Sequence, residues 1–384
     1  MLALVVALAA SALAQNGAPR PADLPTGRVI PSVTCVQDAT ESYALYLPAG
    51  YTPDRAWPVI FAFDPGGRGQ NGVDRYQAAA EQYGFIVAGS NNSRNGRPAG
   101  KAIESMSGDV IARFHVDARR MYTAGMSGGA RVAMSIALSA TKVAGVIASS
   151  AGYPDGQPRK SLRFPVFATA GTEDFNHLEM RQLDAALNTP HHLAIFEGPH
   201  VWLSSALATE AVEWMEVQAM KSGIKPRDDK ELDQLFAKRT AAAAAATNDK
   251  DAFLALQSIV ADFDGLKDVT TFAARLAALG KDKSVREALK KDRDEDEREM
   301  RLLDDVRAAE ERLDTNNPAT RAETLQELRR RWKSLSDQAK APEDSLDRRL
   351  ARRVLSSLGA SVTSNDADYL SIVREFRMGR GGRP

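Results

Sequence analysis

Short apolar runs typical of strands alternate with helical stretches between about residues 29 and 220, and this alternation constrains the fold more than any other feature. It predicts an α/β fold with a mostly parallel sheet and helices on both faces. The predicted strands cover residues 43–47, 59–63, 85–89, 121–124, 143–149, 166–169 and 192–196. The predicted helices between them cover residues 74–83, 108–115, 131–138, 180–187 and 204–220.

The sequence changes character after Lys225-Pro226, where the strand-type runs stop. The rest of the chain is rich in Ala, Leu, Glu, Lys and Arg and poor in aromatic side chains, a composition typical of helices. Helices are predicted over residues 230–247, 250–263, 269–279, 283–313, 318–339, 342–358 and 366–376. We therefore predict an α/β domain over residues 29–225 and a separate all-α domain over residues 226–384.

The charge balance gives no reason to expect nucleic acid or an anionic membrane surface as a partner, because Lys+Arg and Asp+Glu each number 50. In residues 283–301 both signs interleave, which predicts a solvated helix with ion pairs four residues apart. Cys35 is the only cysteine, so neither an internal disulfide nor a cysteine metal site can form. A buried, inert thiol on an early strand is expected. No cofactor and no metal site are predicted.

The first fourteen residues carry no charge and consist almost entirely of Ala, Leu and Val. This run is too short to span a bilayer as a helix. It ends in Ala12-Leu13-Ala14, the small-x-small pattern of a signal-peptidase site. We therefore predict a signal peptide over residues 1–14, a linker over residues 15–28, and a secreted or periplasmic location without a membrane span. The run lacks an initial Lys or Arg, so a buried apolar segment is the alternative.

The motif Gly125-Met126-Ser127-Gly128-Gly129 is a G-x-S-x-G between a predicted strand and a predicted helix. In such a turn the flanking glycines avoid collisions between strand and helix, and the serine hydroxyl is lifted above the carboxyl ends of the strands. The helix start behind it offers free amide groups to a developing oxyanion. Ser127 is therefore the predicted nucleophile.

A serine nucleophile needs a base, and the chain has five histidines. In this fold the acid and then the histidine follow the serine, which excludes His115. His191 and His192 open a predicted strand and are expected to be structural. His200 stands on a loop just beyond that strand, so it is the predicted base, with His177 as the alternative.

The third member must hold the imidazole in the correct tautomer. Asp174 lies a short turn past the predicted strand 166–169 and falls between serine and histidine in chain order, so it is the predicted acid. Glu173 is adjacent and is expected to point elsewhere. Asp155 is the alternative, although its surroundings are typical of a turn.

The oxyanion hole needs two amide donors, one following the nucleophile and one from an earlier strand–helix loop. Gly128 is the predicted first donor. The strand 59–63 leads into the glycine-rich loop Asp64-Pro65-Gly66-Gly67. Gly67 is the predicted second donor, with Gly66 as the alternative.

These motifs resemble the polyhydroxybutyrate-depolymerase and feruloyl-esterase-like branch of the α/β-hydrolases. The resemblance is carried by residues 116–122 before the elbow and by residues 43–51, 171–174 and 198–202. It covers about residues 30–220 and implies a secreted carboxylic-ester hydrolase with an α/β-hydrolase sheet.

The resemblance also carries over individual residues. It implies Ser127, Asp174 and His200 as the catalytic triad. Trp202, in the motif of residues 198–202, is the predicted substrate-binding residue. Two departures matter. Where the family has His-Gly in the oxyanion loop, this chain has Asp64-Pro65-Gly66-Gly67, which bears on the donor assignment. The cysteines of the family are absent, so its disulfides are not expected.

The sequence thus predicts ester cleavage through an acyl-enzyme. Residues 129–174 leave no room for a large inserted cap, so we expect an open cleft that suits a bulky or extended substrate, such as a polymer-linked ester. A peptidase or amidase on the same fold is one alternative, but the N-terminal stretch is too short for a propeller. The other is a scaffold whose helical domain binds a protein partner while the hydrolase half is inert.

Overall fold

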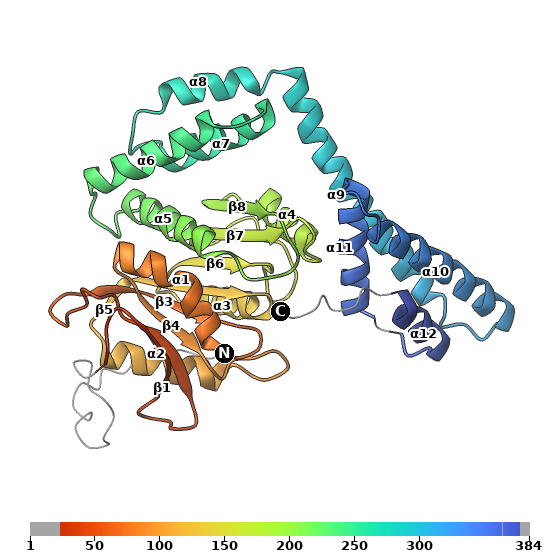
Figure 1. The fold of residues 1–384 in the computed structure, drawn as a ribbon, viewed down its shortest axis with the longest axis horizontal. Helices are drawn as coiled ribbons and strands as arrows, with labels where there is room; N and C mark the ends of the chain where they lie inside the picture. The colour runs from red at the N-terminus through yellow and green to blue at the C-terminus, as the bar shows by residue number, and fades with distance from the viewer. Residues whose placement is uncertain (1–23, 363, 377–384) are drawn as a thin grey trace.

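The structure is a computed structural model that describes residues 24–362 and 364–376 (Figure 1). The predicted signal peptide and most of the predicted linker lie outside the described residues, so export stays a prediction. In the described part, no helix is both long enough and apolar enough to cross a membrane.

An eight-stranded sheet forms the centre of the N-terminal half, in the order β1-β2-β4-β3-β5-β6-β7-β8. β1 and β2 pair antiparallel, β2 and β4 pair antiparallel, and every other pairing is parallel. The strands are β1 (Val29–Thr34), β2 (Ser42–Tyr46), β3 (Trp57–Phe63), β4 (Ile86–Ser90), β5 (Val116–Met126), β6 (Val143–Ser149), β7 (Val166–Gly171) and β8 (His191–Phe196). The predicted mostly parallel sheet is therefore confirmed.

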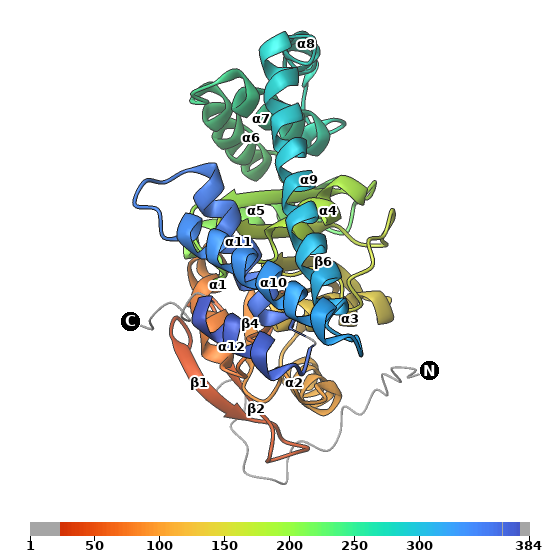
Figure 2. The ribbon, with the colours of Figure 1, turned by 90° about the vertical axis from the view of Figure 1, so that its right-hand side faces the viewer.

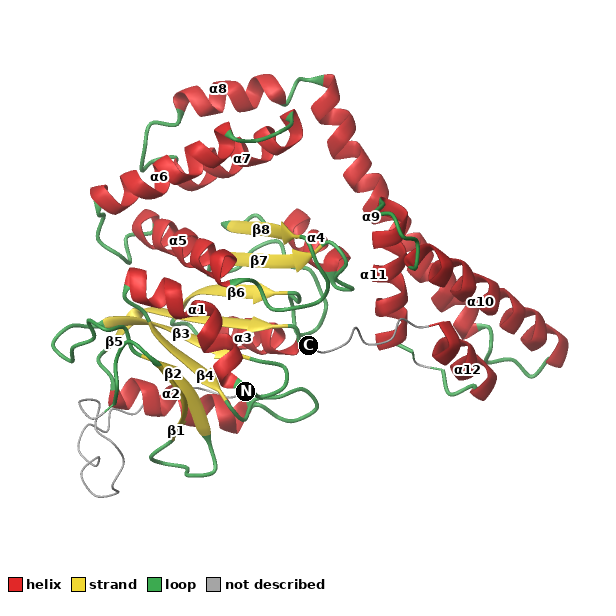
Figure 3. Ribbon diagram, in the orientation of Figure 1, coloured by secondary structure: helices red, strands yellow, loops and turns green. Residues whose placement is uncertain are grey.

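Helices cover both faces of this sheet (Figure 3). One apolar cluster joins the sheet to α1 and α5, and a second joins the opposite face to α2, α3 and α4. These helices are α1 (Gly69–Tyr83), α2 (Gly100–Arg113), α3 (Gly128–Ser139), α4 (His177–Ala186) and α5 (Ser205–Lys221). Every residue of β3 is buried, as expected for a central parallel strand covered on both sides.

Several elements differ from the sequence prediction in their bounds, β1 and α2 the most; α1 and β5 each begin five residues before the predicted start. β1 was not among the predicted strands, and Cys35, expected on an early strand, follows the last residue of β1 and is buried. α2 begins at Gly100, eight residues before the predicted start at Gly108.

The C-terminal part is entirely helical in the described residues, as predicted, and it forms two apolar clusters. In the first, α6 and α7 pack over the outer side of α5, and α8 packs on α7. In the second, α9 to α12 pack on one another and contact Leu178 of α4 (Figure 2). The helices are α6 (Asp229–Ala244), α7 (Asp249–Phe263), α8 (Thr270–Leu279), α9 (Lys283–Glu311), α10 (Pro318–Ala339), α11 (Leu346–Ala360) and α12 (Ala367–Phe376).

The second cluster stands beside the carboxyl ends of the last strands, where α11 faces β7 and β8 (Figure 1). A cavity of about 580 Å³ separates the edge of the sheet from the helices there, and residues of β8, α7, α9 and α11 line it. Ile195 of β8 and Leu254 of α7 line this cavity and are each about 40% exposed. The contacts that arginines of α11 make with the loops after β7 and β8 are polar.

Candidate active site

Ser127 lies in a strained turn between the end of β5 and the start of α3. Its φ of 54° and ψ of −123° fall in a backbone region that residues other than glycine rarely adopt. The turn is held by its backbone: the Ser127 N–H donates to the carbonyl of Ser149 at 2.8 Å, and its carbonyl accepts from the amides of Ala130 and Arg131. This is the geometry of a nucleophile elbow, which exposes the hydroxyl at the carboxyl edge of the sheet.

The two outer glycines of the motif are required by close backbone approach. A Cβ on Gly125 would lie 2.2 Å from the carbonyl oxygen of Gly129. A Cβ on Gly129 would lie 1.9 Å from the carbonyl oxygen of Phe63, in the neighbouring strand β3. The glycines therefore let the start of α3 rest directly on the backbone of β5 and β3.

The structure brings Ser127, His200 and Asp174 into one hydrogen-bonded chain. His200 Nε2 lies 2.8 Å from Ser127 Oγ, and His200 Nδ1 lies 2.7 Å from Asp174 Oδ1. Asp174 is fully buried. Because an ionised carboxylate only accepts, Nδ1 of a neutral imidazole carries the proton and leaves the Nε2 lone pair for the serine hydroxyl. The arrangement can therefore activate Ser127 as a nucleophile.

The aromatic ring of Phe175, next to Asp174, stacks on the imidazole of His200, with ring centroids 3.9 Å apart and an interplanar angle of 30°. This contact limits the rotation of the imidazole. Sequence reasoning did not single out Phe175, although it directly follows the strand-end motif of residues 171–174.

The other four histidines make contacts elsewhere. His177 Nδ1 lies 3.0 Å from the carbonyl oxygen of Gly171, and burial together with nearby Arg353 lowers the pKa of His177 to about 4. His191 contacts Thr189 and Asp184, His192 stacks on Phe167, and His115 contacts the carbonyl of Pro53. Of the histidines, His200 is the one that contacts Ser127.

The alternative acids are also accounted for. Asp155 lies in an exposed turn and pairs with Arg159 at 2.7 Å, which lowers the pKa of Asp155. Glu173 points away from the imidazole, as expected, and binds arginines of α11. Asp174 is thus the acid that the fold brings to His200.

The predicted oxyanion donors differ in whether their backbone N–H groups already donate to an acceptor within the protein. Gly128 opens α3, and the first amides of a helix have no intrahelical acceptor. The Gly67 amide instead donates to the carbonyl of Asp64 at 3.1 Å, and the Gly66 amide donates to Asp64 Oδ1 at 2.8 Å. Gly67 as an oxyanion donor stays a prediction, and that role requires its N–H to be shared with the Asp64 carbonyl.

Asp64 organises the loop that carries the predicted second oxyanion donor. The carboxylate is almost completely buried and accepts from Trp202 Nε1 at 2.9 Å and from Asn71 Nδ2 at 3.1 Å. Burial opposes ionisation, but these bonds and that from Gly66 outweigh it and lower the pKa of Asp64. Trp202 therefore ties the histidine loop to the oxyanion loop, and its role in substrate binding stays a prediction.

Asn95 is a residue of the site that sequence reasoning missed. Its side-chain Oδ1 lies only 1.8 Å from where a Cβ on Gly128 would be, and its backbone N–H donates to the carbonyl of Pro65 at 2.9 Å. The backbone of the neighbouring Arg94 forms an isolated antiparallel β-bridge with Gly66. The available signal was the polar run that follows a predicted parallel strand, because ligands of α/β sheets bind at that end.

Across the residues that the structure describes, no group of three or more His, Cys, Asp or Glu side chains is arranged to hold a metal ion. The reactive groups that the fold brings together at the elbow are the hydroxyl of Ser127, the imidazole of His200 and the carboxylate of Asp174.

No protein-family model matches the sequence, and no curated protein matches it. Among solved structures, the chain is similar to a mutant of the feruloyl esterase module from Clostridium thermocellum complexed with sinapinate, with a TM-score of 0.38 and 16% identity over 48% of this chain and 85% of that one. It is similar to esterase 2 from Thermogutta terrifontis, with a TM-score of 0.37 and 16% identity over 53% and 95%.

A third similar structure is dipeptidyl peptidase 4 from Porphyromonas gingivalis, with a TM-score of 0.37 and 17% identity over 49% of this chain and 35% of that one. These alignments cover about half of the chain. Independently of them, the strand order and the strained serine elbow show that the N-terminal half has the α/β-hydrolase fold, and its neighbours among solved structures include feruloyl esterases and other esterases.

Proposed function

We propose that the chain is an exported serine hydrolase that cleaves carboxylic esters, with Ser127, His200 and Asp174 as its catalytic triad. The observation that carries the proposal is the continuous contact from serine hydroxyl to imidazole to buried carboxylate, at 2.8 Å and 2.7 Å. A serine in a strained elbow with a base in hydrogen-bond contact is the arrangement that acyl transfer needs.

In the proposed reaction, Ser127 Oγ attacks the ester carbonyl carbon while His200 Nε2 takes the hydroxyl proton. The negative charge that develops on the carbonyl oxygen is stabilised by the amide of Gly128, with Gly67 as the proposed second donor. The imidazolium returns its proton to the leaving alcohol, and an acyl ester remains on Ser127. Water then attacks this ester with His200 as base, which releases the acid and restores the hydroxyl.

The connections around the site favour an open cleft. Between the elbow and Asp174 the chain forms α3, β6 and β7, and the segment from residue 150 to residue 165 contains no helix. No helical cap is inserted there. We therefore propose that the substrate is bulky or extended, such as an ester linked to a polymer, rather than a small molecule enclosed by a lid.

The test is hydrolysis of p-nitrophenyl esters, with labelling of the serine by a fluorophosphonate probe. Ser127→Ala is expected to abolish labelling and to lower turnover at least about 10⁴-fold. Ser135→Ala, an exposed serine on the same helix, serves as the matched control and should keep full activity. A Ser127→Ala variant with wild-type turnover would overturn the assignment.

Two further arms separate the alternatives. A p-nitroanilide with the same acyl group measures amide cleavage, because the triad chemistry is shared by esterases and peptidases. Faster anilide than ester cleavage would favour a peptidase. Failure of the wild-type protein to react with the probe would favour a scaffold with an inert hydrolase half.

A further inference from the structure

The loops that carry Asp174 and His200 are joined to each other before they reach those residues. The Thr172 amide donates to the Phe196 carbonyl at 2.9 Å, and the Glu173 amide donates to the Gly198 carbonyl at 2.9 Å. The Thr172 hydroxyl also donates to Glu197 at 3.1 Å. The loop after β7 and the loop after β8 therefore form one hydrogen-bonded unit.

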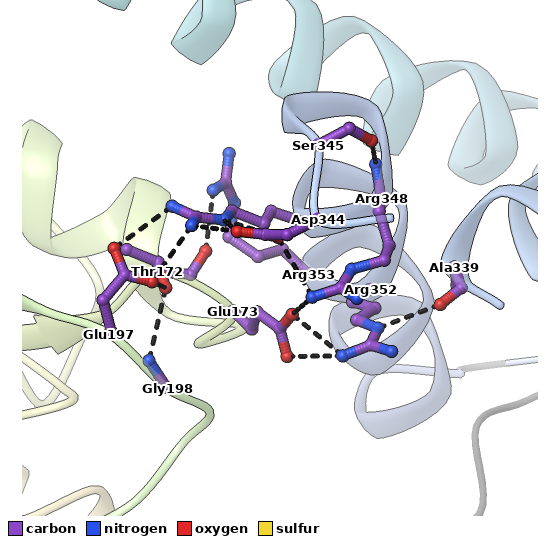
Figure 4. Close-up of polar contacts among 11 residues, drawn as sticks. Thr172, Glu173, Glu197, Gly198, Ala339, Asp344, Ser345, Arg348, Arg352 and Arg353 are labelled. Atoms are coloured by element: carbon purple, nitrogen blue, oxygen red, sulfur yellow. Dashed lines mark hydrogen bonds and ion pairs between the residues drawn. The ribbon is translucent and has the colours of Figure 1, made fainter. Parts of the chain in front are cut away.

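Helix α11 presents four arginines to this unit, at positions 348, 349, 352 and 353, and their spacing of three to four residues places them on one side of the helix. Figure 4 shows Arg348, Arg352 and Arg353. Arg352 Nη1 contacts both carboxylate oxygens of Glu173, at 2.8 Å and 2.9 Å, and Arg348 contacts the same carboxylate at 3.3 Å. The orientation of the Arg352 guanidinium is also fixed from its other side, because its Nε donates to the carbonyl of Ala339 at 2.9 Å.

Arg353 contacts the backbone of the same loop. Its side chain is 2% exposed, and Nη1 donates to the carbonyl of Thr172 at 2.9 Å. Nε donates to Glu299 at 2.7 Å and Nη2 to Glu295 at 3.0 Å, both on α9. An arginine that is desolvated and bound on all sides holds its acceptor firmly.

The loop after β8 is held from the same helix. Arg349 Nη1 donates to Glu197 at 3.2 Å, and Asp344 orients the Arg349 guanidinium at 3.0 Å. Helix α11 therefore contacts the residues that directly precede Asp174 and a residue three positions before His200.

The carboxylate of Asp174 has few contacts of its own to fix its direction. Oδ1 accepts from the amide of Asn176 at 2.8 Å and from His200, whereas Oδ2 is buried with no hydrogen-bond partner among the described residues. The carboxylate is therefore held through one oxygen only, and its position depends on the backbone of its loop, which Arg353 of α11 contacts at the Thr172 carbonyl.

We propose that Arg352 is a positioning residue for the hydrolytic reaction: by binding Glu173 from the helical part of the chain, it holds Asp174 in line with His200. The inference rests on the proposed function. It makes the helical part a component of the active enzyme, because the acid loop is supported from α11.

The experiment uses the full chain and compares Arg352→Gln, Glu173→Gln and the double variant. Turnover of a p-nitrophenyl ester is measured per reactive serine, counted by fluorophosphonate labelling, so that unfolded protein does not contribute. Each single variant is expected to lower kcat about tenfold with KM nearly unchanged, because small misplacements of catalytic groups slow the chemical step. The double variant is expected to be no slower than Glu173→Gln, since that single change already removes the contact with Arg352 together with the longer one with Arg348.

Two controls make the test specific. Arg331→Gln removes an arginine that pairs with Asp305 at 3.0 Å within the helical part and contacts neither loop, so its kcat should stay within about twofold of the wild type. Arg352→Lys keeps the charge and should recover part of the lost turnover.

The outcomes are distinct. If the wild-type protein neither reacts with the probe nor hydrolyses esters, the proposed function fails. If the wild type is active and both single variants keep wild-type kcat per labelled serine, or if the two changes add independently, the positioning role of Arg352 is overturned.

Discussion

Gly128 and Gly129 open the same helix, but the structure predicts opposite consequences when each is replaced by alanine. A Cβ on Gly128 would lie 1.8 Å from Asn95 Oδ1, the end of an exposed and rotatable side chain. A Cβ on Gly129 would lie 1.9 Å from the carbonyl oxygen of Phe63, which is buried in the centre of the sheet. The added atom is the same, and only the partner differs.

The magnitudes come from these contacts. Alanine in place of glycine stabilises a helix by about 0.5–1 kcal/mol, and this gain applies to both positions. For Gly128→Ala, Asn95 rotates away, so the free energy of unfolding should stay within about 1 kcal/mol of the wild type. For Gly129→Ala, a carbon–oxygen contact of about 3.3 Å requires helix and strand to separate by about 1.4 Å. Overpacking of this kind costs about 1–3 kcal/mol, and a backbone partner places it at the upper end.

The assay is thermal unfolding of the full chain, followed by tryptophan fluorescence under identical conditions. Gly129→Ala is expected to lower the Tm by several degrees relative to Gly128→Ala, at about 2–4 °C per kcal/mol for a body of this size. Gly125→Ala, whose Cβ would lie 2.2 Å from the Gly129 carbonyl, should behave like Gly129→Ala. Equal Tm values for the variants at 128 and 129 would refute the argument from backbone contact.

Two further predictions concern buried titratable groups. Burial raises the pKa of Asp262 to about 6 even though its Oδ1 accepts from Trp214 and Gln218, so the folded chain retains a proton that the unfolded chain releases between about pH 4 and 6. The free energy of unfolding should therefore fall as pH rises through this window, by up to about 3 kcal/mol. Asp262→Asn should lose this pH dependence, measured by urea unfolding at about pH 4 to 7. If the variant kept the wild-type pH slope, the prediction would be wrong. Burial raises the pKa of Cys35 to about 12, so Ellman's reagent at about pH 8 should label this thiol only after denaturation, and rapid labelling of the native protein would show the prediction to be wrong.

Most of the secondary structure could be predicted because its signals are local. The run of residues 143–149 and the helix of residues 318–339 were predicted with the bounds that the structure shows. β1 was missed because it is an edge strand with a register shift and a proline, so its apolar pattern is weak. The start of α2 was placed too late because Gly108, inside the helix, resembles a boundary.

The site divides in the same way. Ser127, Asp174 and His200 could be predicted to lie together because each follows a parallel strand, and the carboxyl ends of parallel strands lie at one edge of the sheet. The contact of Trp202 with Asp64 spans 138 residues, and that of Arg352 with Glu173 spans 179. No local pattern specifies such pairs, because they depend on how distant elements pack.

The position of α5 between the sheet and α6–α8 bears on how the chain is made. Its inner side buries Val212 and Met215 against the sheet, and its outer side buries Val217 and Met220 under the following helices. As the polypeptide leaves the ribosome, the hydrolase half is completed while this outer stripe still lacks its cover. A nascent or proteolytically cleaved chain that ends after α5 would expose this apolar surface to water and be prone to self-association. The solubility of the N-terminal half therefore requires the helices that follow it.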